Sequence, residues 1–146
     1  MSRFGKGRLR TGNAIIELTL LMPWIFFLFV GALDFGFYTH ALISVQNATR
    51  VAALYTGQAA AVAGSQPDAC RLARGELSKM PNASSFATGC DSGPLVVTAT
   101  SFTDSEGQLG SRVQIAYQTL PMIPIPGLLT GSITISRIAE VRVVGG

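Results

Sequence analysis

The fold of this chain is decided by residues 12–33, which read GNAIIELTLLMPWIFFLFVGAL. No charged residue occurs between Glu17 and Asp34, and the side chains between them are nearly all apolar. The uncharged run is residues 18–33. Together with the apolar residues 14–16 before Glu17, it approaches the roughly 20 residues, at ~1.5 Å each, that cross a ~30 Å hydrocarbon core. It lacks the polar face of a helix on a soluble core. The sequence therefore predicts a transmembrane helix or a cleaved signal sequence.

The basic residues flank this run on its N-terminal side. The chain has 146 residues, of which 48% are hydrophobic and 13% charged, and its formal net charge is +3. Four basic residues and no acidic one lie in the first 12 residues: Arg3, Lys6, Arg8 and Arg10. The positive-inside rule then places the N-terminus in the cytoplasm and exports the chain beyond Asp34. The other basic residues are too scattered to predict a nucleic-acid surface.

The end of the apolar run favours a helix that stays in the membrane. A secretory signal ends in a small-x-small cleavage site, but residues 32–37 read ALDFGF. Phe35, Phe37 and Tyr38 suit the aromatic belt at the outer interface of a membrane span. We therefore expect a retained span.

Three residues of the run have more than one interpretation. Glu17 alone would be read as an edge carboxylate that reaches water at headgroup level. Pro23 removes the N–H that would bond the carbonyl of Thr19, which predicts a kink, although membrane helices also tolerate proline without a special role. Asp34 is either a solvated boundary residue or a contact between subunits.

The order of features around Glu17 is that of a prepilin: a basic leader, a glycine, a glutamate five residues later and an apolar helix. In this the chain resembles the TadE-like family, small pseudopilins of the tight-adherence (Tad) pilus system. The segments that carry the resemblance, all within residues 10–53, are Arg10–Leu18, Leu21–Pro23, Leu33–Gly36 and Gln46–Ala53. The set is specific in its order, whereas no single segment would be.

The resemblance implies that a prepilin peptidase cuts after Gly12, so that Asn13 becomes the mature N-terminus. A carboxylate in apolar surroundings is costly unless it is paired, and the free α-amino group of Asn13 in a neighbouring subunit is a natural partner for Glu17. Glu17 would then set the axial register between subunits.

The resemblance also implies a location and a set of partners. The protein would lie in the bacterial inner membrane with its head exported, and would enter or prime the pilus. Its partners would be the prepilin peptidase, other pilin and pseudopilin subunits, the inner-membrane pilus assembly platform and membrane lipid, with no nucleic acid. Its role would be structural, with no catalysis and no cofactor.

Helical periodicity continues beyond the apolar run. Apolar residues recur at mostly three- and four-residue steps at Ala41, Leu42, Val45, Ala48, Ala52, Tyr55, Ala59 and Val62. Together with the apolar run they predict one helix of about 50 residues, from about Ala14 to Ala63. A proline at a first helical position predicts a second, short helix over Pro67–Met80.

The last third of the chain has the period of strands. Pro94–Thr103 and Arg112–Thr119 predict a hairpin, and Ser132–Val144 a third strand, with a bulge where the apolar positions slip phase at Arg137. Between them, the proline-rich Leu120–Gly131 is expected to be a loop that faces a partner or grazes the membrane. The predicted class is α+β: a long N-terminal helix packed on a small antiparallel sheet, as in pilins.

The predicted organisation has four parts. Residues 1–12 are a basic leader, 13–37 a transmembrane helix and 38–64 its exported continuation. Residues 65–146 form a small α+β head with a three-stranded antiparallel sheet.

Cys70 and Cys90 both fall on the exported side, where a disulfide is expected. Closing a loop of about 20 residues would stabilise the head by roughly 3 kcal/mol. We expect no metal site, because two thiols and the distant His40 do not supply a zinc ligand set. Asp104 and Glu106 in the hairpin loop fall far short of a calcium-binding pattern and are expected to form a solvated turn.

The leading hypothesis is a minor pilin or pseudopilin that is cut once and then used in pilus assembly. The alternative is an unprocessed, signal-anchored, exported module whose head binds a ligand. A small exported enzyme is the third class, but the sequence holds no G-x-S-x-G, HExxH or phosphate-binding glycine loop.

Overall fold

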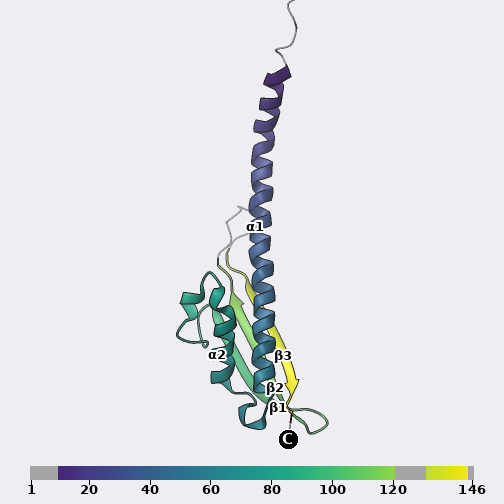
Figure 1. Ribbon diagram of the computed structural model, residues 1–146, viewed down its shortest axis with the longest axis vertical. Coiled ribbons are helices and arrows are strands. Elements are labelled where there is room, and N and C mark those ends of the chain that lie inside the picture. Colours follow the sequence, from purple (N-terminus) through teal and green to yellow (C-terminus); the bar gives the residue numbers. More distant parts are fainter. Residues whose placement is uncertain (1–9, 121–130, 145–146) are drawn as a thin grey trace, which may run out of the picture. The chain divides into compact units, whose positions relative to one another are not determined.

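The computed structural model describes residues 10–120 and 131–144, with side chains from Ala14 onward (Figure 1). The chain divides into two compact units, residues 1–36 and 37–146. The predicted leader up to residue 9 and most of the predicted proline-rich loop, residues 121–130, lie outside the described residues.

Helix α1 (Arg10–Thr56) is the longest element and continues through Pro23. It ends seven residues before the predicted Ala63, and the 3-10 turn η1 (Ala60–Val62) comes next. The end lies at Gly57, where an added Cβ would come within 2.8 Å of a methyl group of Val141. The backbone of α1 is therefore in close contact with the sheet at this point, and the chain turns away although the next residues are alanine-rich.

Helix α2 (Gln66–Glu76) begins as the sequence predicted, with a proline in its first turn. The predicted helix was too long, because from Leu77 the chain tightens into the 3-10 turn η2 (Leu77–Lys79). A further 3-10 turn, η3 (Ala83–Phe86), leads toward the sheet.

The sheet is three-stranded and antiparallel, in the order β1 (Leu95–Thr103), β2 (Leu109–Gln118) and β3 (Thr134–Arg142). The predicted bulge at Arg137 is wrong, since β2 and β3 pair without interruption along their lengths. The apolar phase slips because β3 turns Ile138 to the uncovered face of the sheet, where 58% of it is exposed.

Within the unit of residues 37–146, α1 packs on this sheet, as the α+β prediction required. The helix contributes a stripe of small side chains, and the sheet contributes larger ones. The fully buried members are Val45, Ala48, Ala52, Ala53, Leu95, Val113 and Ile115. Alanine on the helix lets its backbone approach the sheet closely, so a core with few large residues is enclosed between them.

Tyr117 fixes the end of β2 against the turns that come after α2. Its hydroxyl donates a hydrogen bond to Asn82 Oδ1, and Asn82 Nδ2 donates to the carbonyl of Gln118 at 3.1 Å. The Tyr117 ring meets Phe86 edge-on, with 6.2 Å between centroids. Burial raises the pKa of the Tyr117 hydroxyl, which favours the neutral donor form.

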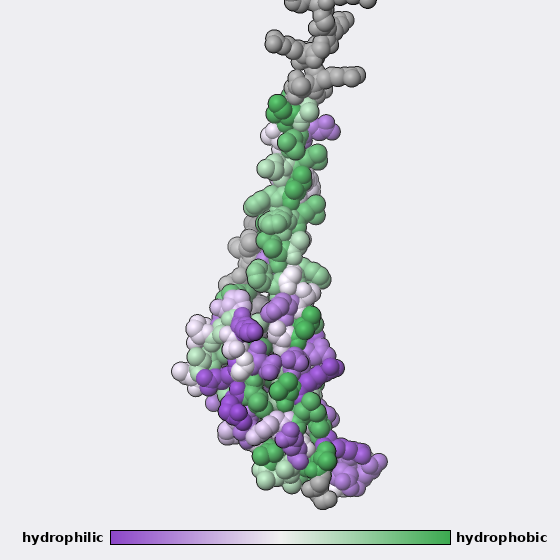
Figure 2. Space-filling model, in the orientation of Figure 1, coloured by the Kyte–Doolittle hydropathy of each residue, from purple (hydrophilic) through white to green (hydrophobic). Residues whose placement is uncertain are grey.

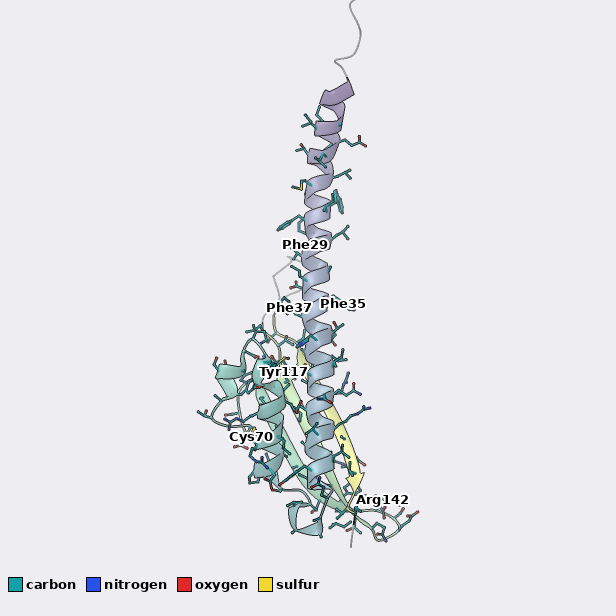
Figure 3. The ribbon with its side chains drawn as sticks, in the orientation of Figure 1. Phe29, Phe35, Phe37, Cys70, Tyr117 and Arg142 are labelled. Atoms are coloured by element: carbon teal, nitrogen blue, oxygen red, sulfur yellow. A yellow bond between two sulfur atoms is a disulfide. The ribbon has the colours of Figure 1, made fainter. Side chains whose placement is uncertain are left out.

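Cys70 and Cys90 form a disulfide with a Cα–Cα distance of 5.8 Å. The bond joins α2 to the loop before β1, and Figure 3 shows Cys70 on α2. It closes the segment that holds both 3-10 turns η2 and η3.

Replacing both cysteines by serine should lower the free energy of unfolding by roughly 3 kcal/mol, because the unfolded chain regains the entropy of the open loop. Urea denaturation of the full chain in detergent micelles, monitored by near-UV circular dichroism, measures the change. Reductant should destabilise the original chain and leave the double variant unaffected. Equal midpoints for the two chains would show that the disulfide contributes nothing.

Candidate functional site

The first half of α1 carries a large apolar surface. Every large apolar side chain from Ile15 to Phe29 is at least 49% exposed. Figure 2 shows them gathered over this part of the helix. By length and composition, α1 from Ala14 onward could cross a membrane. So much contiguous apolar surface needs lipid or other protein around it.

Glu17 is the one carboxylate on this surface between residues 14 and 33. Its side chain is exposed and makes no hydrogen bond or ion pair within the described residues. The polar neighbour Thr19 has an internal partner, since its Oγ1 donates to the carbonyl of Ile15 at 2.8 Å. Glu17 is therefore the polar group of this surface that needs an external partner.

The expected cleavage site lies in the same helix. α1 begins at Arg10, so the backbone at Gly12 and Asn13 is helical. Asn13 lies one helical turn before Glu17, which places both residues on one face of the helix. The cleavage after Gly12 and the pairing between subunits remain predictions.

Asp34, at the end of the apolar run, is buried. The side chain is only 8% exposed, and its Oδ2 has no hydrogen-bond partner among the described residues. A solvated boundary residue would have a large exposed fraction. The burial argues against the solvated interpretation, whereas a contact with another subunit remains a prediction.

The hairpin turn between β1 and β2 is organised by Asp104. Its Oδ1 accepts the backbone N–H groups of Glu106 and Gln108, both at 2.9 Å. Arg142, labelled in Figure 3, places Nη2 2.9 Å from Asp104 Oδ2 and 2.9 Å from Glu106 Oε2. The hydrogen bond from the backbone N–H of Gln108 holds the pKa of the Asp104 carboxyl below its ordinary value. The backbone N–H of Glu106 and the Arg142 guanidinium act in the same direction. A guanidinium thus bridges the two carboxylates of the hairpin loop. The described residues contain no cluster of three or more His, Cys, Asp or Glu side chains suited to a metal ion.

A shallow hollow of about 520 Å³ lies beside α2. Arg71 and Arg74 line it, and Gly75 leaves room in it because an added Cβ would meet nothing within 4 Å. Arg71 is held by Asp68 at 3.2 Å and lies 5.6 Å from the ring centroid of Tyr55. Arg74 has no carboxylate partner in the described chain.

A family model described as TadE-like protein matches residues 12–54. The match runs from the expected cleavage site to two residues before the end of α1 and confirms the resemblance in that region. No curated protein and no solved structure matches the chain. The match covers less than a third of the chain, so it shows similarity to TadE-like proteins over that stretch. By length and composition, the helix within it could cross a membrane.

Asp104→Asn should lower the stability of the chain at pH 7 and flatten its dependence on acid pH. A carboxylate whose pKa is depressed by folding stabilises the fold above its ordinary value of 3.8, and that contribution is lost as the pH falls through the folded value. Urea midpoints between pH 7 and pH 3 measure the effect. Asp91, exposed and unpaired within the described residues, supplies the control, since Asp91→Asn should keep the original profile. Parallel profiles for the original chain and Asp104→Asn would contradict this role.

Proposed function

We propose that this chain is a minor pilin or pseudopilin, cleaved by a prepilin peptidase after Gly12 and then used to assemble or prime a Tad-type pilus. The observation that carries the proposal is the TadE-like match over residues 12–54, which coincides with the exposed apolar helix and its carboxylate at Glu17. A helix of this kind can lie in a bilayer before assembly and against other helices afterwards.

The proposed orientation places the N-terminus in the cytoplasm and the head outside the inner membrane. The basic leader supports it through the positive-inside rule. The disulfide between Cys70 and Cys90 supports it as well, because disulfides persist in oxidising compartments.

The proposed cleavage gives Glu17 its partner. Cutting after Gly12 creates a cationic α-amino group on Asn13, at the cytoplasmic edge of the apolar surface. In a neighbouring subunit shifted along the helix axis, that amino group can meet Glu17. Removing one member of such a pair leaves an uncompensated charge in apolar surroundings, at a cost of several kcal/mol. Subunits out of register are therefore disfavoured.

The alternative function is an unprocessed, membrane-anchored module whose head binds a ligand. The hollow beside α2 favours it, because Arg71 and Arg74 there could bind an anionic group. Mass spectrometry of the protein from its native host separates the two functions. A chain that starts at Asn13 supports the pilin, whereas a chain that retains Met1 or Ser2 supports the module.

Gly12→Leu should block processing, because a bulky side chain would occupy the small position before the scissile bond. Immunoblotting should show only the full-length precursor, with at least a tenfold loss of mature chain. Gly31→Leu is the matched control: the same change within α1, at a position where an added Cβ meets nothing within 4 Å. Mature Asn13 chains from the Gly12 variant would refute the cleavage site.

Glu17→Ala should be cleaved normally but should not enter pili, since the pairing with Asn13 of the next subunit is lost. Sheared pili analysed by mass spectrometry, beside membrane fractions, measure incorporation. Thr19→Val is the control, because it removes a polar group whose hydrogen bond lies within its own helix. Normal incorporation of the Glu17 variant would exclude the proposed register pair.

A further inference from the structure

The three-stranded sheet has two edges, and the outer edge of β1 is closed by side-chain and loop contacts. The backbone N–H of Val97 donates to the carbonyl of Cys90 at 2.9 Å. The side-chain amide of Gln66 pairs with β1 as a strand would: Nε2 donates to the Val97 carbonyl at 2.5 Å, and Oε1 accepts the N–H of Ala99 at 2.7 Å.

The next outward N–H along β1 is covered by close packing. Gly64, at φ 70°, lies so near that an added Cβ would be 2.5 Å from the backbone nitrogen of Ser101. Only glycine fits there, both sterically and in its backbone conformation. There is therefore no space for another strand against this part of β1.

The outer edge of β3 is open. Two hydrogen bonds, from Thr119 N to Ile133 O and from Val143 N to Leu109 O, are both 2.9 Å long. They show which residues of the third strand direct their main-chain N–H and C=O groups toward β2. Since antiparallel pairs alternate, the residues between these positions alternate as well. The residues whose main-chain N–H and C=O groups point away from β2, toward the open edge, are Thr134, Ser136, Ile138, Glu140 and Arg142.

The outward main-chain groups of Ile138 and Glu140 bond to no described residue. Beyond them, the edge is closed only at its end, where the N–H of Val144 donates to the carbonyl of Gly57 at 3.1 Å. On the N-terminal side of Ile138, Arg137 Nη1 donates a hydrogen bond to the carbonyl of Ser136 at 3.2 Å. The centre of β3 thus offers unpaired donors and acceptors to another chain.

The charges of β3 indicate what that chain carries. Glu140 pairs with Arg112 at 2.7 Å, and Arg142 with the hairpin carboxylates. Arg137, on the α1-facing side, has no carboxylate partner among the described residues. On the opposite face, Ile138 is 58% exposed. A strand that places a carboxylate opposite Arg137 and an apolar side chain opposite Ile138 complements both.

We propose that the open edge of β3 binds an extended segment of another polypeptide by strand addition, antiparallel to β3 and with an acidic residue opposite Arg137. Main-chain hydrogen bonds to Ile138 and Glu140 hold the segment, and the alternating side chains select it. Arg137 would lie in a pair without main-chain hydrogen bonds, where facing side chains approach most closely. The inference rests on the sheet alone and holds whether or not the chain is a pilin.

Amide hydrogen exchange of the ¹⁵N-labelled full chain in detergent micelles tests the edge directly. The probe is the peptide acetyl-TVTVEVTVT-amide, whose glutamate and valines lie on opposite faces of a strand. Without peptide, the amides of Ile138 and Glu140 should exchange at least tenfold faster than those of Arg137 and Ala139. Saturating peptide should slow the first pair at least tenfold. The same peptide with lysine in place of glutamate should bind at least fivefold more weakly.

Two substitutions separate main-chain docking from general effects. Ile138→Pro removes an outward N–H that the β2–β3 pairing does not use, so it should keep the fold and abolish peptide protection of Glu140. Ile138→Thr keeps the N–H and should still bind. Arg137→Glu should reverse the preference, so that the lysine peptide binds more tightly.

Three results would overturn the proposal. The first is peptide protection that survives Ile138→Pro in a chain whose other amides show the original exchange. The second is slow exchange of Ile138 and Glu140 without peptide at every protein concentration, which would mean a closed edge. The third is protection that grows with protein concentration alone, which would make a second copy of this chain the occupant.

Discussion

The apolar surface of α1 between Ile15 and Phe29 is the constraint on which the rest of this protein depends. Each large apolar side chain moved out of water contributes about 1.5–3 kcal/mol, and the sum over this surface exceeds the ~5–15 kcal/mol that stabilises a typical domain. No arrangement of a small head can cover it. The helix must therefore always be in lipid or among other helices, and each polar group on it requires a partner there. This is the physical reason for the proposed pairing of Glu17 with the α-amino group of a neighbouring subunit.

Local patterns in the sequence predicted much of the fold. An uncharged run of this length has few alternatives, and the alternation in β1 and β2 marks a hairpin directly. The helix end and the course of β3 were mispredicted, because both depend on contacts between distant residues. Gly57 ends α1 where it meets Val141, although the alanines after it would continue a helix in isolation. Ile138 made β3 resemble a bulged strand, because an apolar residue was assumed to face the core.

The candidate site divides in the same way. Glu17 stands out in the sequence as a charge beside an apolar run, and its proposed role in subunit register comes from the order of features around it. The burial of Asp34 has no sequence signal, since an acid at the end of an apolar run is normally read as solvated. Arg142 bridges Asp104 and Glu106 across more than 30 residues of chain, so the sequence predicted a solvated turn there without this ion pair. Contacts between segments that are distant in the sequence could not be predicted from residue types alone.

The disulfide that stabilises the head also holds the segments that close one of the two sheet edges, the outer edge of β1. Cys70 lies on α2, the helix whose first residue, Gln66, pairs with β1, and Cys90 supplies the carbonyl that accepts the N–H of Val97. One covalent bond therefore connects the two segments whose hydrogen bonds pair with the outer edge of β1. An unpaired edge strand invites association with other chains. In an oxidising compartment the bond helps to keep β1 closed, which leaves β3 as the edge for the proposed strand addition.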